Sequence, residues 1–202
     1  MLLTEGAAQP TDIPDHVVVV IKQTAAAYFM VYYGDKDNPD EVAAQAKIRG
    51  APYLGKVRFG KNDNHGIGPC DGAMKIGHSR AQHGWGPMLY DVAMEHATQI
   101  ANGLIADRDS VSGSARAVWD YYLANRGDVM AHQLDDLKNT LTPKEEDNCH
   151  QGVARAKPGV RGRGWQDEDT DQSWVDSPLS KRYTKEPTTI NALKAAGKLV
   201  IL

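Results

Sequence analysis

A chain of 202 residues is long enough to bury one hydrophobic core, and we expect a single domain over residues 1–202. Its 23 basic and 26 acidic residues leave a net charge of −3, which excludes a general attraction to nucleic acid or anionic membranes. The longest purely apolar run, residues 17–21, is too short to cross a bilayer, and the N-terminal MLLTEGAAQPTD lacks the features of a secretory signal. We therefore expect a cytoplasmic protein without a membrane partner.

The two cysteines, Cys70 and Cys149, are too few for a disulfide framework. Neither lies at zinc-finger spacing from a second cysteine or a histidine, so we predict no metal site. We interpret the neighbouring Cys149 and His150 as an incidental pair rather than a catalytic dyad.

The first third of the chain predicts strands separated by turns. Residues 16–23, HVVVVIKQ, have the density of β-branched side chains that is typical of a buried strand, and residues 26–34 predict a second strand. Asp40 is placed to cap a short helix over residues 41–49. Residues 53–60 predict a third strand, and the turn-forming residues after them indicate a loop.

The middle of the chain alternates strands and helices. Residues 73–79 predict a strand, after which a glycine-rich turn enters a helix whose apolar residues recur at i, i+3 and i+4 spacings. Asn102 and Gly103 end this helix, and residues 103–107 predict a short strand. The sequence SGSARAVWDYYLANRG then predicts a second amphipathic helix. This order favours an α/β fold.

The last third of the chain has fewer apolar residues. Thr142, Pro143 and Glu145 have the pattern of a capped helical turn, whereas residues 151–170 lack apolar periodicity and predict a long loop. Residues 189–196 predict a helix that Gly197 ends, and the final LVIL predicts a strand that needs a sheet to join.

The turn at residues 81–86 has the features of a phosphate-binding site. A glycine-rich turn between a strand and a helix exposes backbone N–H groups at the positive end of the helix dipole, which suits phosphate groups. Gly84 and Gly86 have no β-carbon to hold a diphosphate away, although the turn lacks the third glycine of the dinucleotide fingerprint and the lysine of a P-loop. We predict phosphate or diphosphate binding, with an ordinary strand-to-helix connection as the alternative.

The block over residues 73–129 resembles the acyl-coenzyme A-dependent N-acyltransferases of the GNAT superfamily. In that family a strand runs into a turn of pattern [QR]-x-x-G-x-[GA], and AQHGWG matches both glycine positions, with Ala81 at the opening position. Downstream, DRDSVSGSARAVWDYY resembles the family segment N-x-x-A-x-x-x-Y, with Ser112 at the Asn position, Ala115 matching and Trp119 at the Tyr position. A looser resemblance is to acyltransferase-like proteins encoded by bacteriophages.

The resemblance implies an α/β fold with a mixed, mostly antiparallel central sheet, a splayed strand pair and flanking helices. Residues 136–187 would then be a loop-rich insertion where acceptor specificity is built. The co-substrate would be acetyl-coenzyme A or another acyl-coenzyme A, and the acceptor a small-molecule or protein amine. In the family the turn amides hold the diphosphate, which corresponds here to the segment Gln82, His83, Gly84, Trp85 and Gly86.

Acyl transfer to an amine needs a base, because an amine with a pKa of about 10.4 is almost wholly protonated near neutral pH. His78 and Asp107, each at the end of a predicted strand, are candidates for this base. In the family a phenol protonates the departing thiolate, and Tyr121 and Tyr122 are the nearest phenols here. For each side chain the alternative is a structural role.

The strand that precedes the turn supplies a further part of the expected site. Its backbone N–H groups near Ile76, Gly77 and His78 are the natural oxyanion hole for the thioester carbonyl.

Two other functions are compatible with the sequence. The chain could be a catalytically inactive module, such as a phage accessory protein in the host cytoplasm, because fold alone does not fix function. Alternatively, a basic loop over residues 153–164 could bind nucleic acid, although the acidic residues after it favour a solvated loop. The sequence specifies neither the acyl group nor the acceptor nor the oligomeric state.

Overall fold

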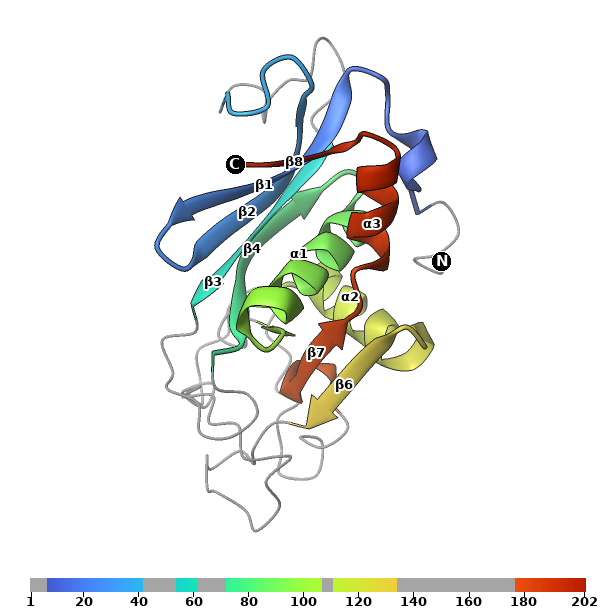
Figure 1. Ribbon diagram of the computed structural model, residues 1–202. Helices are drawn as coiled ribbons and strands as arrows, with labels where there is room; N and C mark the ends of the chain where they lie inside the picture. Colours follow the sequence, from blue (N-terminus) through green and yellow to red (C-terminus); the bar gives the residue numbers. More distant parts are fainter. Residues whose placement is uncertain (1–6, 42–53, 62–71, 107–110, 134–176) are drawn as a thin grey trace. The chain divides into compact units, whose positions relative to one another are not determined.

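The computed structural model describes residues 7–41, 54–61, 72–106, 111–133 and 177–202 (Figure 1). In this part of the chain eight β-strands and three α-helices occur, and the expected α/β fold is confirmed. None of the helices in these ranges is both long and apolar enough to span a membrane. Several predicted features lie outside the described residues: both cysteines, most of the helix at 41–49, the helical turn at 142–145 and the loop at 151–170.

The chain forms two compact units. The first comprises residues 1–60, 76–96 and 187–202, and the second comprises residues 61–75 and 97–186. Strand β4 (Met74–Ala81) and helix α1 (Gly86–Ala101) contribute residues to both units.

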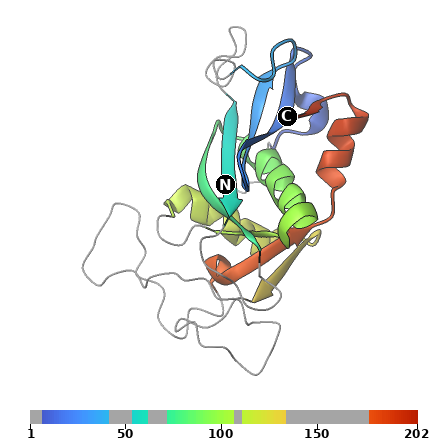
Figure 2. The same ribbon diagram turned by 60° about the vertical axis from the view of Figure 1, so that its left-hand side comes forward.

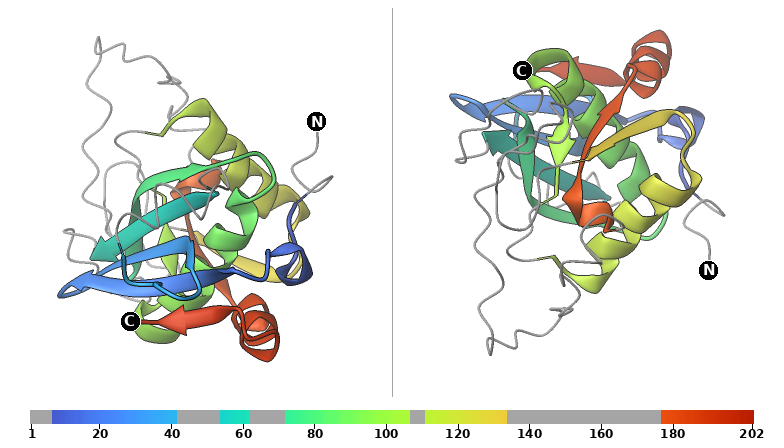
Figure 3. Two further views of the ribbon diagram at one scale, coloured as in Figure 1. Left: turned by 90° about the horizontal axis from the view of Figure 1, so that it is seen from above. Right: turned by 90° about the horizontal axis from the view of Figure 1, so that it is seen from below.

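The sheet of the first unit has the strand order β4-β3-β2-β1-β8. β1 (Val17–Ala25) and β2 (Tyr28–Asp35) form an antiparallel hairpin, and β3 (Gly55–Lys61) runs antiparallel to β2. β8 (Leu199–Ile201) lies at the edge of the sheet, parallel to β1 (Figure 3). Segments from opposite ends of the sequence are therefore paired in this sheet.

All five residues of the β-branched run of β1, Val17–Ile21, are buried, so side chains on both faces of this strand are shielded from solvent. On one face Val18 and Val20 pack with Met30 and Tyr32, and Val200 of β8 packs against this cluster. These contacts explain why the run reads as continuously apolar rather than alternating.

Helix α1 covers the other face of this sheet (Figure 2). The rings of Phe29 and Phe59 stack with centroids 5.6 Å apart, and the His96 ring meets Phe29 edge-on at 5.0 Å. Burial lowers the pKa of His96, which favours the neutral imidazole among these aromatic rings. The predicted apolar stripe of the helix is confirmed, because Leu89 and Val92 are fully buried.

In the second unit the strand order is β6-β7-β5, and β5 also pairs with the first residues of β4. β5 (Leu104–Ile105) is parallel to β4 and antiparallel to β7 (Lys181–Lys185). β7 in turn runs antiparallel to β6 (Val129–Gln133). Helix α2 (Gly113–Asn125) covers this group of strands and stacks the Trp119 ring on a β7 tyrosine.

Strands β6 and β7 are not among the elements that the sequence predicts. β7 and the 3₁₀ turn before it (Pro178–Ser180) lie within the region 136–187, which the sequence identifies as a loop-rich insertion. The sequence does not predict β7 because the strand lacks an apolar pattern. Its buried residues include the charged side chains of Arg182 and Lys185 beside Tyr183. Arg182 donates to the carbonyl of Asn102 at 2.7 Å, at the negative end of the α1 dipole.

Candidate functional site

The glycine-rich turn between β4 and α1 is open to solvent in the first unit. Gln82 and His83 are exposed, whereas Gly84, Trp85 and Gly86 are partly buried. The Gln82 amide donates to the Leu54 carbonyl at 2.9 Å, which continues the pairing of β4 with β3 into the turn. The Trp85 amide then donates back to the Gln82 carbonyl at 3.1 Å and closes the turn.

Gly84 is required by the geometry of this turn. Its φ angle is +83°, a left-handed conformation that glycine adopts without the steric cost of a β-carbon. The glycine that was predicted from the sequence to let a ligand approach therefore also sets the direction of the backbone.

The carbonyl groups of the turn are held by donors from other parts of the first unit. The Ala8 amide donates to the Gly84 carbonyl at 2.9 Å, and the buried Tyr33 hydroxyl of β2 donates to the Trp85 carbonyl at 2.9 Å. By contrast, within the described ranges no acceptor faces the amides of Gly84 and Gly86. The carbonyls of Gly84 and Trp85 are thus hydrogen-bonded within the protein, whereas the amides of Gly84 and Gly86 remain able to donate hydrogen bonds to a ligand.

The start of α1 adds a positive potential to these donors. The first amides of a helix have no acceptor within the helix, and Trp85, just before its first residue, has no side-chain acceptor to cap them. The first turn of α1 contains no acidic residue. An anion at this position would meet the positive end of a 16-residue helix.

Two buried tyrosines, Tyr33 and Tyr90, form hydrogen bonds with the turn or with the strand before it. Burial and the charge of Asp91 raise the pKa of Tyr33, and burial raises the pKa of Tyr90. The Tyr90 hydroxyl is 2.8 Å from the Ser79 hydroxyl of β4. Both phenols therefore stay protonated near neutral pH and act as hydrogen-bonding groups rather than as bases.

The residues predicted to act beside the turn lie on β4. His78 and Gly77 are exposed, whereas Ile76 is buried. β4 pairs with β5 at Met74 and Lys75, and the register of this pair in the described chain does not continue to Ile76. His78 is thus an exposed residue that lies close to the turn in sequence.

The predicted acids lie in the second unit, on α2. The Tyr122 ring is buried 6.3 Å from Trp119, and the Arg126 guanidinium lies 5.1 Å above it. Tyr121 is partly exposed, with its ring 6.2 Å from that of Tyr122. Tyr121 is therefore the more accessible phenol. Asp107 lies outside the described residues.

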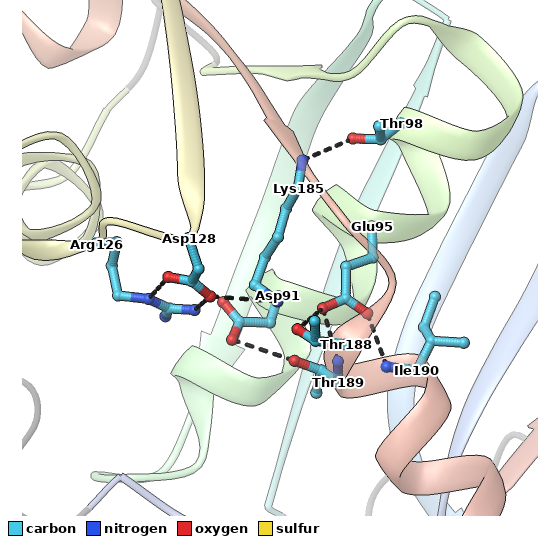
Figure 4. A network of polar contacts seen from close by, with 9 residues as sticks. All are labelled: Asp91, Glu95, Thr98, Arg126, Asp128, Lys185, Thr188, Thr189 and Ile190. Carbon is cyan, nitrogen blue, oxygen red and sulfur yellow. Dashed lines mark hydrogen bonds and ion pairs between the residues drawn. The ribbon is translucent and has the colours of Figure 1, made fainter.

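Sequence reasoning missed the buried acid of α1, whose contacts Figure 4 shows. Glu95 has no exposed surface, and its carboxylate accepts from the amides of Thr189 at 2.8 Å and Ile190 at 2.7 Å. These amides belong to the first turn of α3 (Thr188–Ala195), so Glu95 caps that helix from outside. Glu95 lies outside the apolar stripe of α1, so the spacing of the sequence gives no signal of its burial.

A second polar cluster, also drawn in Figure 4, lies in the second unit. Arg126 donates to both carboxylate oxygens of Asp128, at 2.7 and 2.8 Å, and the buried Lys185 ammonium lies 3.4 Å from the same group. We interpret this cluster as structural, because it joins the end of α2 to β7. Among the residues that the structure describes, no group of three or more His, Cys, Asp and Glu side chains could hold a metal ion.

Comparisons with known proteins add no assignment. No protein-family model, no curated protein and no solved structure matches this chain.

Proposed function

We propose that the protein is an acyl-coenzyme A-dependent N-acyltransferase, in which acetyl-coenzyme A is the favoured donor and an amine the acceptor. One observation carries this proposal. An accessible turn with fixed carbonyls and unpaired amides follows β4 directly, and it opens onto the first residues of α1. The GNAT resemblance implies such a diphosphate site.

The β4-β5 pair supports the same proposal. The resemblance implies two parallel strands that separate beside the thioester, and β4 is parallel to β5 with pairing over Met74 and Lys75. The backbone of Ile76, Gly77 and His78 would then be available to polarise the thioester carbonyl.

The chemistry proposed for the site is direct acyl transfer. The neutral amine attacks the thioester carbonyl, a C–N bond forms, and the C–S bond breaks with the electron pair remaining on sulfur. His78 or Asp107 would take the proton from the amine, directly or through water. Of the two phenols that the resemblance offers as the acid, Tyr121 is the more exposed and therefore the one we would test first.

A second candidate is an inactive module that keeps the binding turn. Trp119, at the position where the resemblance expects the catalytic tyrosine, is buried and stacked 4.9 Å from the Tyr183 ring. A side chain so placed serves packing rather than proton transfer. Such a module would bind coenzyme A but transfer no acyl group.

Calorimetry with acetyl-coenzyme A tests the proposal. We expect micromolar binding by the wild-type chain and loss of binding in Gly84→Glu, because the new side chain places a carboxylate and a strained backbone in the turn. Gly72→Glu is the matched control, since Gly72 has a similar φ of +84° and no atom lies within 4 Å of the position that a β-carbon would take there.

The outcomes separate the two candidates. Binding together with thiol release in the presence of amines supports the enzyme, and binding without turnover supports the inactive module. The proposal fails if the wild-type chain does not bind acetyl-coenzyme A at millimolar concentration, or if Gly72→Glu loses binding to the same extent as Gly84→Glu.

A further inference from the structure

We propose that Tyr33 is a positioning residue for the turn and that its hydroxyl aims the Gly86 amide at the bound diphosphate. The inference deepens the proposed function and rests on it. Tyr33 lies in β2, has no exposed surface, and donates to the Trp85 carbonyl at 2.9 Å. Its ring also meets the Trp85 ring edge-on, with centroids 5.3 Å apart.

The planarity of the peptide bond connects Tyr33 to Gly86. In a trans peptide the carbonyl of one residue and the amide of the next point in opposite directions. The Trp85 carbonyl points to the buried Tyr33 hydroxyl, so the Gly86 amide in the same peptide points away from it. Because no described residue accepts from this amide, its direction follows from the Tyr33 hydrogen bond together with the start of α1 at Gly86.

Ala8 provides a second tether for the same turn. Its amide donates to the Gly84 carbonyl at 2.9 Å, one peptide before the one that Tyr33 holds. Two consecutive peptides are thus oriented before any ligand arrives. A donor that is already oriented loses less conformational entropy when it binds an anion.

The phenol is suited to this task over a wide pH range. Burial, helped by the charge of Asp91, raises the pKa of Tyr33, so the hydroxyl remains a donor. The Trp85 carbonyl does not titrate. We therefore expect the positioning effect to be independent of pH between about 6 and 9.

The neighbouring Tyr32 offers a matched control. It is also fully buried, and its hydroxyl donates to the Pro39 carbonyl at 2.7 Å. Tyr32 belongs to the cluster on the other face of the sheet, so its hydrogen bond does not reach the turn. The variants Tyr33→Phe and Tyr32→Phe each remove one buried hydroxyl and leave one carbonyl without its donor.

The test compares these two variants for thermal stability and for affinity. We expect both to lose stability, but only Tyr33→Phe to weaken acetyl-coenzyme A binding, by about tenfold. Affinity for pantetheine, which lacks the diphosphate, should not change in Tyr33→Phe. The inference is overturned if Tyr33→Phe binds acetyl-coenzyme A as tightly as the wild-type chain, or if Tyr32→Phe weakens binding equally.

If Tyr33→Phe does not fold, a measurement on the wild-type chain tests the same inference. In a titration with inorganic pyrophosphate followed by amide NMR, the Gly86 resonance should move more than that of Trp85, whose amide is already bonded to Gln82. The reverse order contradicts the inference. If the wild-type chain binds neither acetyl-coenzyme A nor pyrophosphate, the proposed function itself fails, whereas wild-type binding that is insensitive to Tyr33→Phe removes only the positioning role.

Discussion

Asp128 shows how one carboxylate holds two cations in the second unit. Arg126 donates to both of its oxygens, and the ammonium of Lys185, whose side chain is 1% exposed, lies 3.4 Å from the same group. The hydrogen bond from Arg126 is the main reason that the pKa of Asp128 falls to about 2, and the positive charges of Arg126 and Lys185 add to the effect.

This cluster predicts a specific dependence of stability on pH. The pKa of Asp128 is about 2 in the folded chain, compared with the ordinary value of 3.8, so its contribution is fully present above about pH 4. That contribution is lost as the pH falls through about 2. Because Asp128 is 48% exposed, we expect solvent to limit it to about 1 kcal/mol or less.

Urea unfolding of Asp128→Asn at a series of pH values measures the effect. The variant should be less stable than the wild-type chain near neutral pH, and the difference should shrink between about pH 4 and 2. In an Arg126→Gln background the main cause of the shift is absent, so this pH dependence should be much weaker. A difference that stays constant down to about pH 2 would contradict the prediction.

At the scale of elements, α3 is attached to α1 through Glu95. The carboxylate accepts from the amides of Thr189 and Ile190 and from the Thr188 hydroxyl, at 2.8, 2.7 and 3.3 Å. The preceding Pro187, at the N-cap of α3, makes no side-chain cap. The start of α3 therefore takes its acceptors from another helix, and Ile190 and Leu193 are buried behind it.

We predict that Glu95→Ala lowers the free energy of unfolding by roughly 2–4 kcal/mol, because the first amides of α3 lose a charged acceptor inside the core. Glu186→Ala is the matched control, since Glu186 is exposed and close in sequence to α3, and it should change stability by less than about 0.5 kcal/mol. Chemical denaturation provides the measurement. Equal effects of the two substitutions would show that Glu95 is not a cap.

The elements with a strong local pattern are the ones that could be predicted. β1 is visible as a β-branched run, and α1 is visible through its apolar stripe, since each pattern matches the period of its backbone. The strand predicted at residues 103–107 is confirmed only over Leu104 and Ile105. β6 has no alternating apolar face, because Met130 and Ala131 are both exposed, and it forms through its partner β7.

The candidate turn could be predicted in part, because it too has a local sequence pattern. Gly84 and Gly86 reveal a strand-to-helix turn in the sequence itself, and the positive φ of Gly84 confirms the need for glycine. Tyr33 could not be found in this way. It lies far from Trp85 in the sequence, and only the folded sheet brings its hydroxyl to the turn.

At the scale of the molecule, the pairing of β1 with β8 joins segments from opposite ends of the sequence. Val19 donates to the Lys198 carbonyl at 2.8 Å, and Leu202 donates to the Ile21 carbonyl at 2.9 Å. β8 therefore covers the backbone edge of a strand whose five residues 17–21 are buried and apolar. An uncovered edge of this composition favours pairing with another chain.

We predict that Val200→Pro detaches β8, because proline cannot donate to the ladder. The variant should be less stable by roughly 1–3 kcal/mol and should self-associate through the exposed edge of β1. Light scattering after size-exclusion chromatography measures the association. Ile201→Thr is the control, since Ile201 is 58% exposed and its side chain contributes little; self-association of this control to the same degree would refute the explanation.

The position of β1 between β2 and β8 also sets an order of events during translation. The hairpin partner leaves the ribosome soon after β1, whereas Val20 must wait for Val200 before its other edge is closed. At roughly 5–20 residues per second this delay is on the order of ten to forty seconds. During that time one edge of an apolar strand has no partner in the nascent chain, and we expect chaperones that bind extended apolar segments to reduce its aggregation during synthesis.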